Sequence, residues 1–74
     1  MSNELKKADI LRQKIWNIVV SMDIPKFIRV EIRGVLNVLN SFKLENLYSN
    51  IDIFQEYLRQ LVYNYEYSVI QSVG

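Results

Sequence analysis

The spacing of apolar residues is the feature that most limits what this chain can fold into. In three stretches of the 74 residues, apolar side chains recur at steps of three and four, which places them along one side of an α-helix. No apolar run approaches the roughly 18 residues needed to cross a bilayer. The pattern predicts an all-α fold, a compact three-helix array with helices over about 3–22, 25–42 and 50–73. We expect one helical domain over residues 1–74.

The first two predicted helices each have one clear apolar side. In the first helix that side consists of Ala8, Leu11, Ile15, Ile18, Val19 and Met22. In the second it consists of Ile28, Ile32, Val35, Leu36, Leu39 and Phe42. Pro25 lies between them, where it cannot continue one helix but suits the first turn of the next. Asp23 is a candidate N-cap of that second helix.

Residues 27–33 also fit a β-strand, because apolar and polar side chains alternate from Ile28 to Arg33. With a strand there, the order strand, helix, helix resembles the ribbon-helix-helix repressors. In that family two strands pair across a dimer and enter the major groove of DNA. The resemblance implies that Arg29, Glu31 and Arg33 would read bases. The helical pattern continues well beyond Gly34, whereas the alternation stops there, so a helix is favoured.

The third predicted helix has apolar residues on two sides. Ile51, Phe54, Leu58, Leu61, Tyr65 and Val69 form the side expected to face the core. Tyr63, Tyr67 and Ile70 recur on another side, which a helix does not need in order to join a core. Trp16 likewise lies off the centre of its own apolar side. We therefore predict that Tyr63, Tyr67, Ile70 and Trp16 contact a partner, with a second copy of the chain as the leading candidate.

The chain lacks the usual means of bracing a small domain. It has no cysteine and no histidine, so disulfides, thiolate metal sites and imidazole ligands are all excluded. Domains this small commonly need disulfides, a metal or oligomerisation. The composition therefore predicts a homodimer that holds no metal and no cofactor.

Catalysis has few candidate residues. The commonest general base and the best nucleophile are missing together with histidine and cysteine. Asp52 and Glu56 lie one helical turn apart, near a predicted helix start, where carboxylates favour the helix dipole. The two glycines, Gly34 and Gly74, form no phosphate-binding loop. We expect no enzymatic activity and no small-molecule substrate.

A polar row on the second helix is the candidate for binding charged partners. It consists of Lys26, Arg29, Arg33, Asn37 and Asn40. The cations suit phosphates and the amides suit base edges, although the row would equally fit an acidic protein surface or a solvated helix face. The net charge of +1 provides no overall attraction to nucleic acid.

Gly34 interrupts the interior of the second predicted helix, at a cost of about 1 kcal/mol relative to alanine. Phe27, Val30 and Val38 surround it on a side distinct from the main apolar one. A missing side chain there allows another backbone to approach closely. The alternative is a kink or the end of a strand.

The expected function is that of a non-enzymatic helical interaction module, such as a regulator, inhibitor or adaptor, that binds another protein. The alternative is a dimeric nucleic-acid-binding regulator, ribbon-helix-helix-like or helical, that uses the polar row. Ile, Asn, Lys, Tyr, Phe and Met supply 31 of the 74 residues, and their AT-rich codons suggest an AT-rich genome, that of a low-GC bacterium, a virus or a mobile element. No secretory signal or membrane partner is predicted, and we expect a cytoplasmic location.

Overall fold

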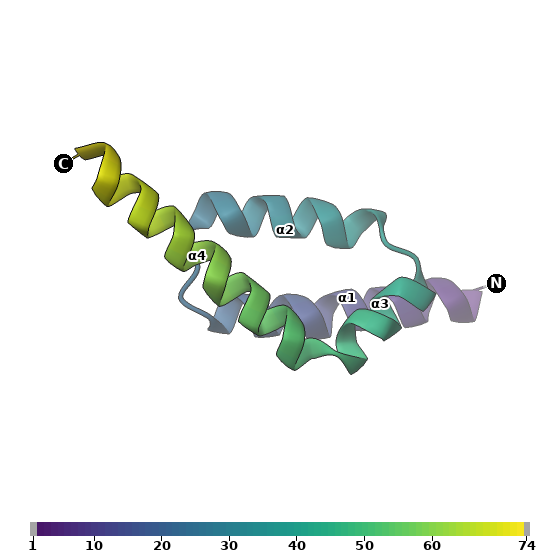
Figure 1. The fold of residues 1–74 in the computed structure, drawn as a ribbon. Helices are drawn as coiled ribbons and strands as arrows, with labels where there is room; N and C mark the ends of the chain where they lie inside the picture. The colour runs from purple at the N-terminus through teal and green to yellow at the C-terminus, as the bar shows by residue number, and fades with distance from the viewer. Residues whose placement is uncertain (1, 74) are drawn as a thin grey trace.

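The chain forms four helices in the computed structural model, which describes residues 2–73 and the side chains of residues 3 and 5–71 (Figure 1). The helices are α1 (Ser2–Ser21), α2 (Lys26–Val38), α3 (Ser41–Ser49) and α4 (Ile51–Val73). The predicted all-α class is confirmed. Residues 2–73 contain no strand, so the strand alternative at 27–33 is wrong. The ribbon-helix-helix resemblance loses the element on which it depended.

The helical spacing in α2 prevails because it buries one continuous stripe. Ile28, Ile32 and Leu36 are all buried, as steps of four residues along a helix require. Val30, which the strand pattern would place with Ile28 and Ile32, is 60% exposed. The alternation of apolar and polar residues therefore reflects a helix that has apolar side chains on its outer side as well.

The predicted count of three helices is wrong, because the second predicted helix is broken at residues 39–40. Leu39 and Asn40 have extended backbones, and the Asn40 side chain accepts a hydrogen bond of 2.9 Å from the Lys43 N–H. That contact makes Asn40 the N-cap of α3. Leu44, which is fully buried, fixes α3 to the core. Phe42, expected in the core, is 74% exposed.

Loss of the Asn40 cap has a measurable cost. We expect Asn40→Ala to lower the free energy of unfolding by about 1 kcal/mol, because the Lys43 N–H loses its acceptor. Thermal denaturation followed by circular dichroism should show a Tm lower by about 4–8 °C. Asn40→Asp keeps the accepting oxygen and is the matched control. A Tm equally low in both variants would contradict the capping role.

Asp23, the predicted N-cap of α2, does not cap this helix. Pro25 occupies the N-cap position, and the Pro25 carbonyl accepts the N–H groups of Ile28 and Arg29 at 3.1 Å. No side chain caps this helix start. At the other end, Arg12 of α1 donates from Nε to the Leu36 carbonyl and from Nη2 to the Leu39 carbonyl, each at 2.9 Å. Arg12 thus joins α1 to the last turn of α2.

The core lies around α1, which packs against both α2 and α3. Its buried members are Ala8, Leu11, Ile15 and Val19 of α1, Ile24, Ile28, Ile32 and Leu36 near and within α2, Leu44 of α3, and Leu58 of α4. Among the described side chains of α4, only Leu58 is buried. Ile51, Phe54 and Val62 are partly buried against the same core. The fourth helix is thus attached mainly through its first half.

The molecule is elongated, and the predicted compact array is wrong in this respect. The Cα radius of gyration is 14.3 Å, and the extents are 54 × 20 × 17 Å. A compact domain of this length has a radius of about 11 Å. The C-terminal part of α4 runs beyond the other helices (Figure 1). Over the described residues, no helix combines the length and apolarity that a bilayer crossing requires.

Candidate functional site

The end of α4 forms a projecting C-terminal arm, which we define as residues 63–71. Every side chain in the C-terminal arm is exposed. Its large apolar members are Tyr63, Tyr65, Tyr67, Val69 and Ile70, which are 41–66% exposed. Tyr65 and Val69, predicted to face the core, are therefore not buried. The C-terminal arm presents apolar surface on more than one side.

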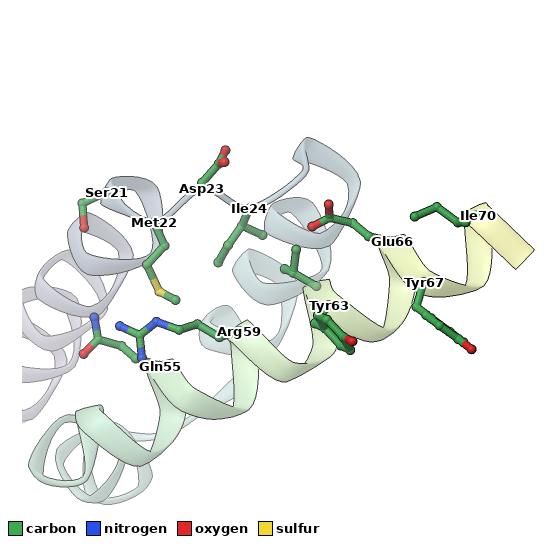
Figure 2. Close-up of a pocket in the computed structure, with 11 residues that line it drawn as sticks. Ser21, Met22, Asp23, Ile24, Gln55, Arg59, Tyr63, Glu66, Tyr67 and Ile70 are labelled. Carbon is green, nitrogen blue, oxygen red and sulfur yellow. The ribbon is translucent and has the colours of Figure 1, made fainter.

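A groove of about 710 Å³ lies between α4 and the connection that joins α1 to α2. We call it the arm groove. Figure 2 shows Met22 and Ile24 on the side of the connection, with Tyr63, Tyr67 and Ile70 along α4. Val62 completes the apolar lining. Three of the four residues predicted to contact a partner, Tyr63, Tyr67 and Ile70, thus line one groove.

Among the charged residues that line the arm groove, carboxylates outnumber cations. Asp23 and Glu66 line it and form no ion pair with another described residue. Arg59, also in the lining, pairs with Glu56 at 3.3 Å. Two carboxylates are therefore left to interact with whatever occupies the groove, whereas the single cation already has an anionic neighbour.

Trp16, the fourth residue predicted to contact a partner, lies elsewhere. It is half-buried and packs against the core. The Arg33 guanidinium lies over its ring at 5.0 Å from the centroid, a cation–π contact between α1 and α2. Trp16 and Arg33 line a separate hollow of about 240 Å³. The structure does not bring Trp16 to the arm groove.

The polar row predicted on the second helix is not continuous. Lys26, Arg29, Arg33 and Asn37 lie in α2, whereas Asn40 lies beyond its end and caps α3. Arg33 is stacked on Trp16. The Nε of Arg29 is buried with no hydrogen-bond partner among the described residues. Lys26 is the exposed cation at the start of the row.

A second, more apolar groove of about 370 Å³ separates α2 from α4. Ile28, Ile32 and Leu36 line one side of it, and Phe54, Leu58 and Leu61 line the other. The two helices meet nearer the start of α2. There the rings of Phe27 and Tyr65 pack edge to face, with centroids 4.8 Å apart. Sequence periodicity gives no indication of this groove, because it depends on the angle at which the two helices diverge.

The outer face of α2 consists of Phe27, Val30, Gly34 and Val38, which recur at steps of three and four. The three side chains are 50%, 60% and 81% exposed. A Cβ placed on Gly34 would have no neighbour within 4 Å, so no described part of the chain uses the notch that this glycine creates. The helix runs unbroken through Gly34, so the predicted kink or strand end is wrong. No described part of the chain makes the close backbone approach predicted at Gly34, and such an approach by a partner stays a prediction.

Neither a metal site nor a known relative points to a function for this chain. Over the described residues, no three Asp, Glu, His or Cys side chains gather in a way that would hold a metal ion. Comparisons with protein-family models, with curated proteins and with solved structures find no significant match. The fold and its surfaces define a small all-helical protein with a grooved apolar surface on α4 and an uncovered apolar face on α2.

Proposed function

We propose that this chain is a non-enzymatic helical interaction module that forms a homodimer and binds an amphipathic helix of another protein in the arm groove. The observation that supports this most directly is the arm groove itself. Tyr63, Tyr67 and Ile70 are 65%, 55% and 66% exposed and share one concave surface. Tyrosine contributes strongly to binding energy in protein interfaces. A groove of this kind suits the docking of a helix along its length.

The total exposed surface supports association. The chain exposes 5684 Å², whereas a folded monomer of 8.8 kDa exposes about 4800 Å². The excess of roughly 900 Å² is close to the approximately 800 Å² that each partner contributes to an interface of standard size. An excess of this size is consistent with surface on the isolated chain that association would cover.

The groove lining supports a particular chemistry for the bound helix. Met22, Ile24 and Val62 would bury an apolar stripe of the partner. Asp23 and Glu66 would attract lysine or arginine beside that stripe. We therefore propose a basic amphipathic helix as the ligand. In this proposal the chain acts as a regulator, inhibitor or adaptor in the cytoplasm, and its abundance of amino acids with AT-rich codons suggests a viral or mobile-element origin.

The nucleic-acid alternative receives less support than protein binding. Arg33 is already stacked on Trp16, and Asn40 is occupied as the cap of α3. The polar row of α2 therefore has fewer side chains available to contact phosphates or bases than the sequence predicts. Binding of DNA or RNA through Lys26, Arg29, Arg33 and Asn37 stays a prediction, as does binding of an acidic protein.

The arm groove is tested with a labelled synthetic helix that has leucine along one side and lysine beside it. We expect the double variant Tyr63→Ala, Tyr67→Ala to weaken its binding at least about tenfold, because two large contact side chains are lost. Fluorescence anisotropy measures the affinity, and circular dichroism checks that the fold is retained.

Tyr57→Ala is the matched control, because Tyr57 lies on the same helix at 61% exposure but outside the arm groove. It should leave the affinity unchanged. A second peptide with glutamate in place of lysine should bind more weakly to the unmodified chain. Equal loss in the tyrosine double variant and in Tyr57→Ala would refute the assignment of the groove.

A further inference from the structure

The outer face of α2 is an apolar helix side that the chain itself leaves largely uncovered. Phe27, Val30 and Val38 lie on the opposite side of α2 from the buried stripe of Ile28, Ile32 and Leu36. At this face the ring of Phe27 packs against the ring of Tyr65. Gly34 lies in the middle of this face with open space above it. Another helix can therefore approach the backbone of α2 more closely at Gly34 than a larger residue would permit.

Two opposite charges border the outer face of α2. Lys26 lies on one flank and Glu31, five residues later, lies on the other, and both are exposed. In two parallel helices that pack side by side, a residue on one flank faces the residue five positions later on the other flank of the partner helix. Lys26 of one copy would therefore face Glu31 of a second copy, twice in each dimer. An antiparallel pair joins like flanks and leaves these charges without partners.

We propose that the outer face of α2 is where the chain associates with a second copy of itself, with the two α2 helices parallel and in contact at Gly34. This inference rests on the self-association in the proposed function and names the surface that performs it. The complementary flanks identify the occupant as a second copy, because the face carries both members of the charge pair. A parallel pair of identical helices has a two-fold axis, which closes the assembly at a dimer.

The arm groove stays open in such a dimer. On α4, Tyr65 contacts Phe27 of α2, whereas Tyr63 and Tyr67, two residues before and after it, lie on the other side of the helix. A partner on the outer face of α2 would extend over Phe27 and Tyr65 without entering the groove. The dimer would then present two arm grooves, one from each copy.

Charge reversal tests the parallel arrangement. In sedimentation experiments on the full chain over micromolar concentrations, we expect Lys26→Glu and Glu31→Lys each to raise the dimer Kd about tenfold, because two attractive pairs become repulsive. The double variant Lys26→Glu, Glu31→Lys restores opposite charges and should recover a Kd within about threefold of the unmodified chain. Unchanged Kd values in both single variants, or no recovery in the double variant, would overturn the parallel pairing.

Gly34→Glu tests the position of the contact without threatening the fold. Glutamate favours helix over glycine, and a Cβ at Gly34 meets nothing within the chain, so helicity and monomer stability should be maintained or increased. Two carboxylates at the dimer axis should raise the dimer Kd at least about a hundredfold. Helicity by circular dichroism accompanies the sedimentation measurement.

The outcomes separate this inference from the proposed function. A dimer that persists in Gly34→Glu but is lost in Tyr63→Ala, Tyr67→Ala would overturn the α2 face and leave self-association intact, through the arm. An unmodified chain that is monomeric throughout the micromolar range would overturn both the α2 face and the proposed homodimer. Peptide binding in the arm groove is measured separately. A dimer formed through the arm would compete with the peptide for Tyr63 and Tyr67, whereas a monomeric chain would leave the groove open to it.

Discussion

Leu58→Ala should lower the free energy of unfolding by about 3 kcal/mol, the typical cost of truncating a fully buried leucine. Leu58 is 1% exposed and is the only described side chain of α4 that is buried. A chain of this length has a total stability of about 4–11 kcal/mol. The variant should therefore lose a large part of its stability, as measured by urea denaturation at one fixed protein concentration, because association itself contributes to stability.

Leu61→Ala is the control for this prediction. The substitution removes the same side-chain atoms about one turn later on α4, but the Leu61 side chain is 38% exposed. We expect a smaller loss, of about 2 kcal/mol, in proportion to the smaller apolar area that this side chain buries. Equal losses at the two positions would show that α4 is not attached through Leu58.

Arg12→Lys should cost about 2 kcal/mol although the charge is retained. The guanidinium donates to the carbonyls of Leu36 and Leu39 at once, both at 2.9 Å. These carbonyls lie at the end of α2, where a helix runs out of its own N–H donors, and the Leu36 carbonyl also accepts a long hydrogen bond of 3.4 Å from the Leu39 N–H. An ammonium group is a point donor and does not reproduce the two-pronged geometry of arginine. Charged hydrogen bonds of this kind contribute about 1.5–3 kcal/mol each.

Arg59→Lys is the matched control for Arg12→Lys. Arg59 forms an ion pair with Glu56 at 3.3 Å, and both side chains are more than half exposed. Pairs of this kind contribute little to stability, so the change should stay within about 0.5 kcal/mol. Urea denaturation gives the free energy of unfolding of the two variants. Equal losses would contradict the claim that the hydrogen bonds from Arg12 hold the end of α2 against α1.

The buried stripes were largely predictable from the sequence. Ala8, Leu11, Ile15 and Val19 in α1, together with Ile28, Ile32 and Leu36 in α2, are buried as their spacing predicts. They are predictable because burial of a continuous helix side depends on the period of the helix alone. Val35 was assigned to the same side and is 55% exposed, since it lies at the margin of that stripe.

The helix ends were not predictable in the same way. The break at Leu39 and Asn40 depends on a cap that Asn40 forms and on the hydrogen bonds that Arg12 supplies from a distant part of α1. Nothing in the periodicity of residues 25–42 indicates that such a donor is within reach. The predicted helices leave residues 43–49 outside any helix, because the single buried residue of α3, Leu44, forms no stripe.

The candidate surface was partly predictable. Tyr63, Tyr67 and Ile70 were identified as the side of a helix that a core does not require, and the structure places all three at the arm groove. Their contact with a partner stays a prediction. The periodicity of α4 failed for Leu61 and Tyr65, which are exposed, because burial also requires a neighbouring element that extends far enough to cover them.

The continuity of α4 makes the C-terminal arm a lever. The helix is unbroken from Ile51 to Val73, and Leu58 and Ile70 lie about 18 Å apart along its axis. A partner bound at Tyr67 and Ile70 would therefore act on the attachment at Leu58 through one continuous helix. Tilting the free end by binding would widen or close the groove between α2 and α4, which lies beside Leu58. A force applied at the tip would thus reach both contacts that hold the helix, the ring pair of Tyr65 with Phe27 and the buried Leu58.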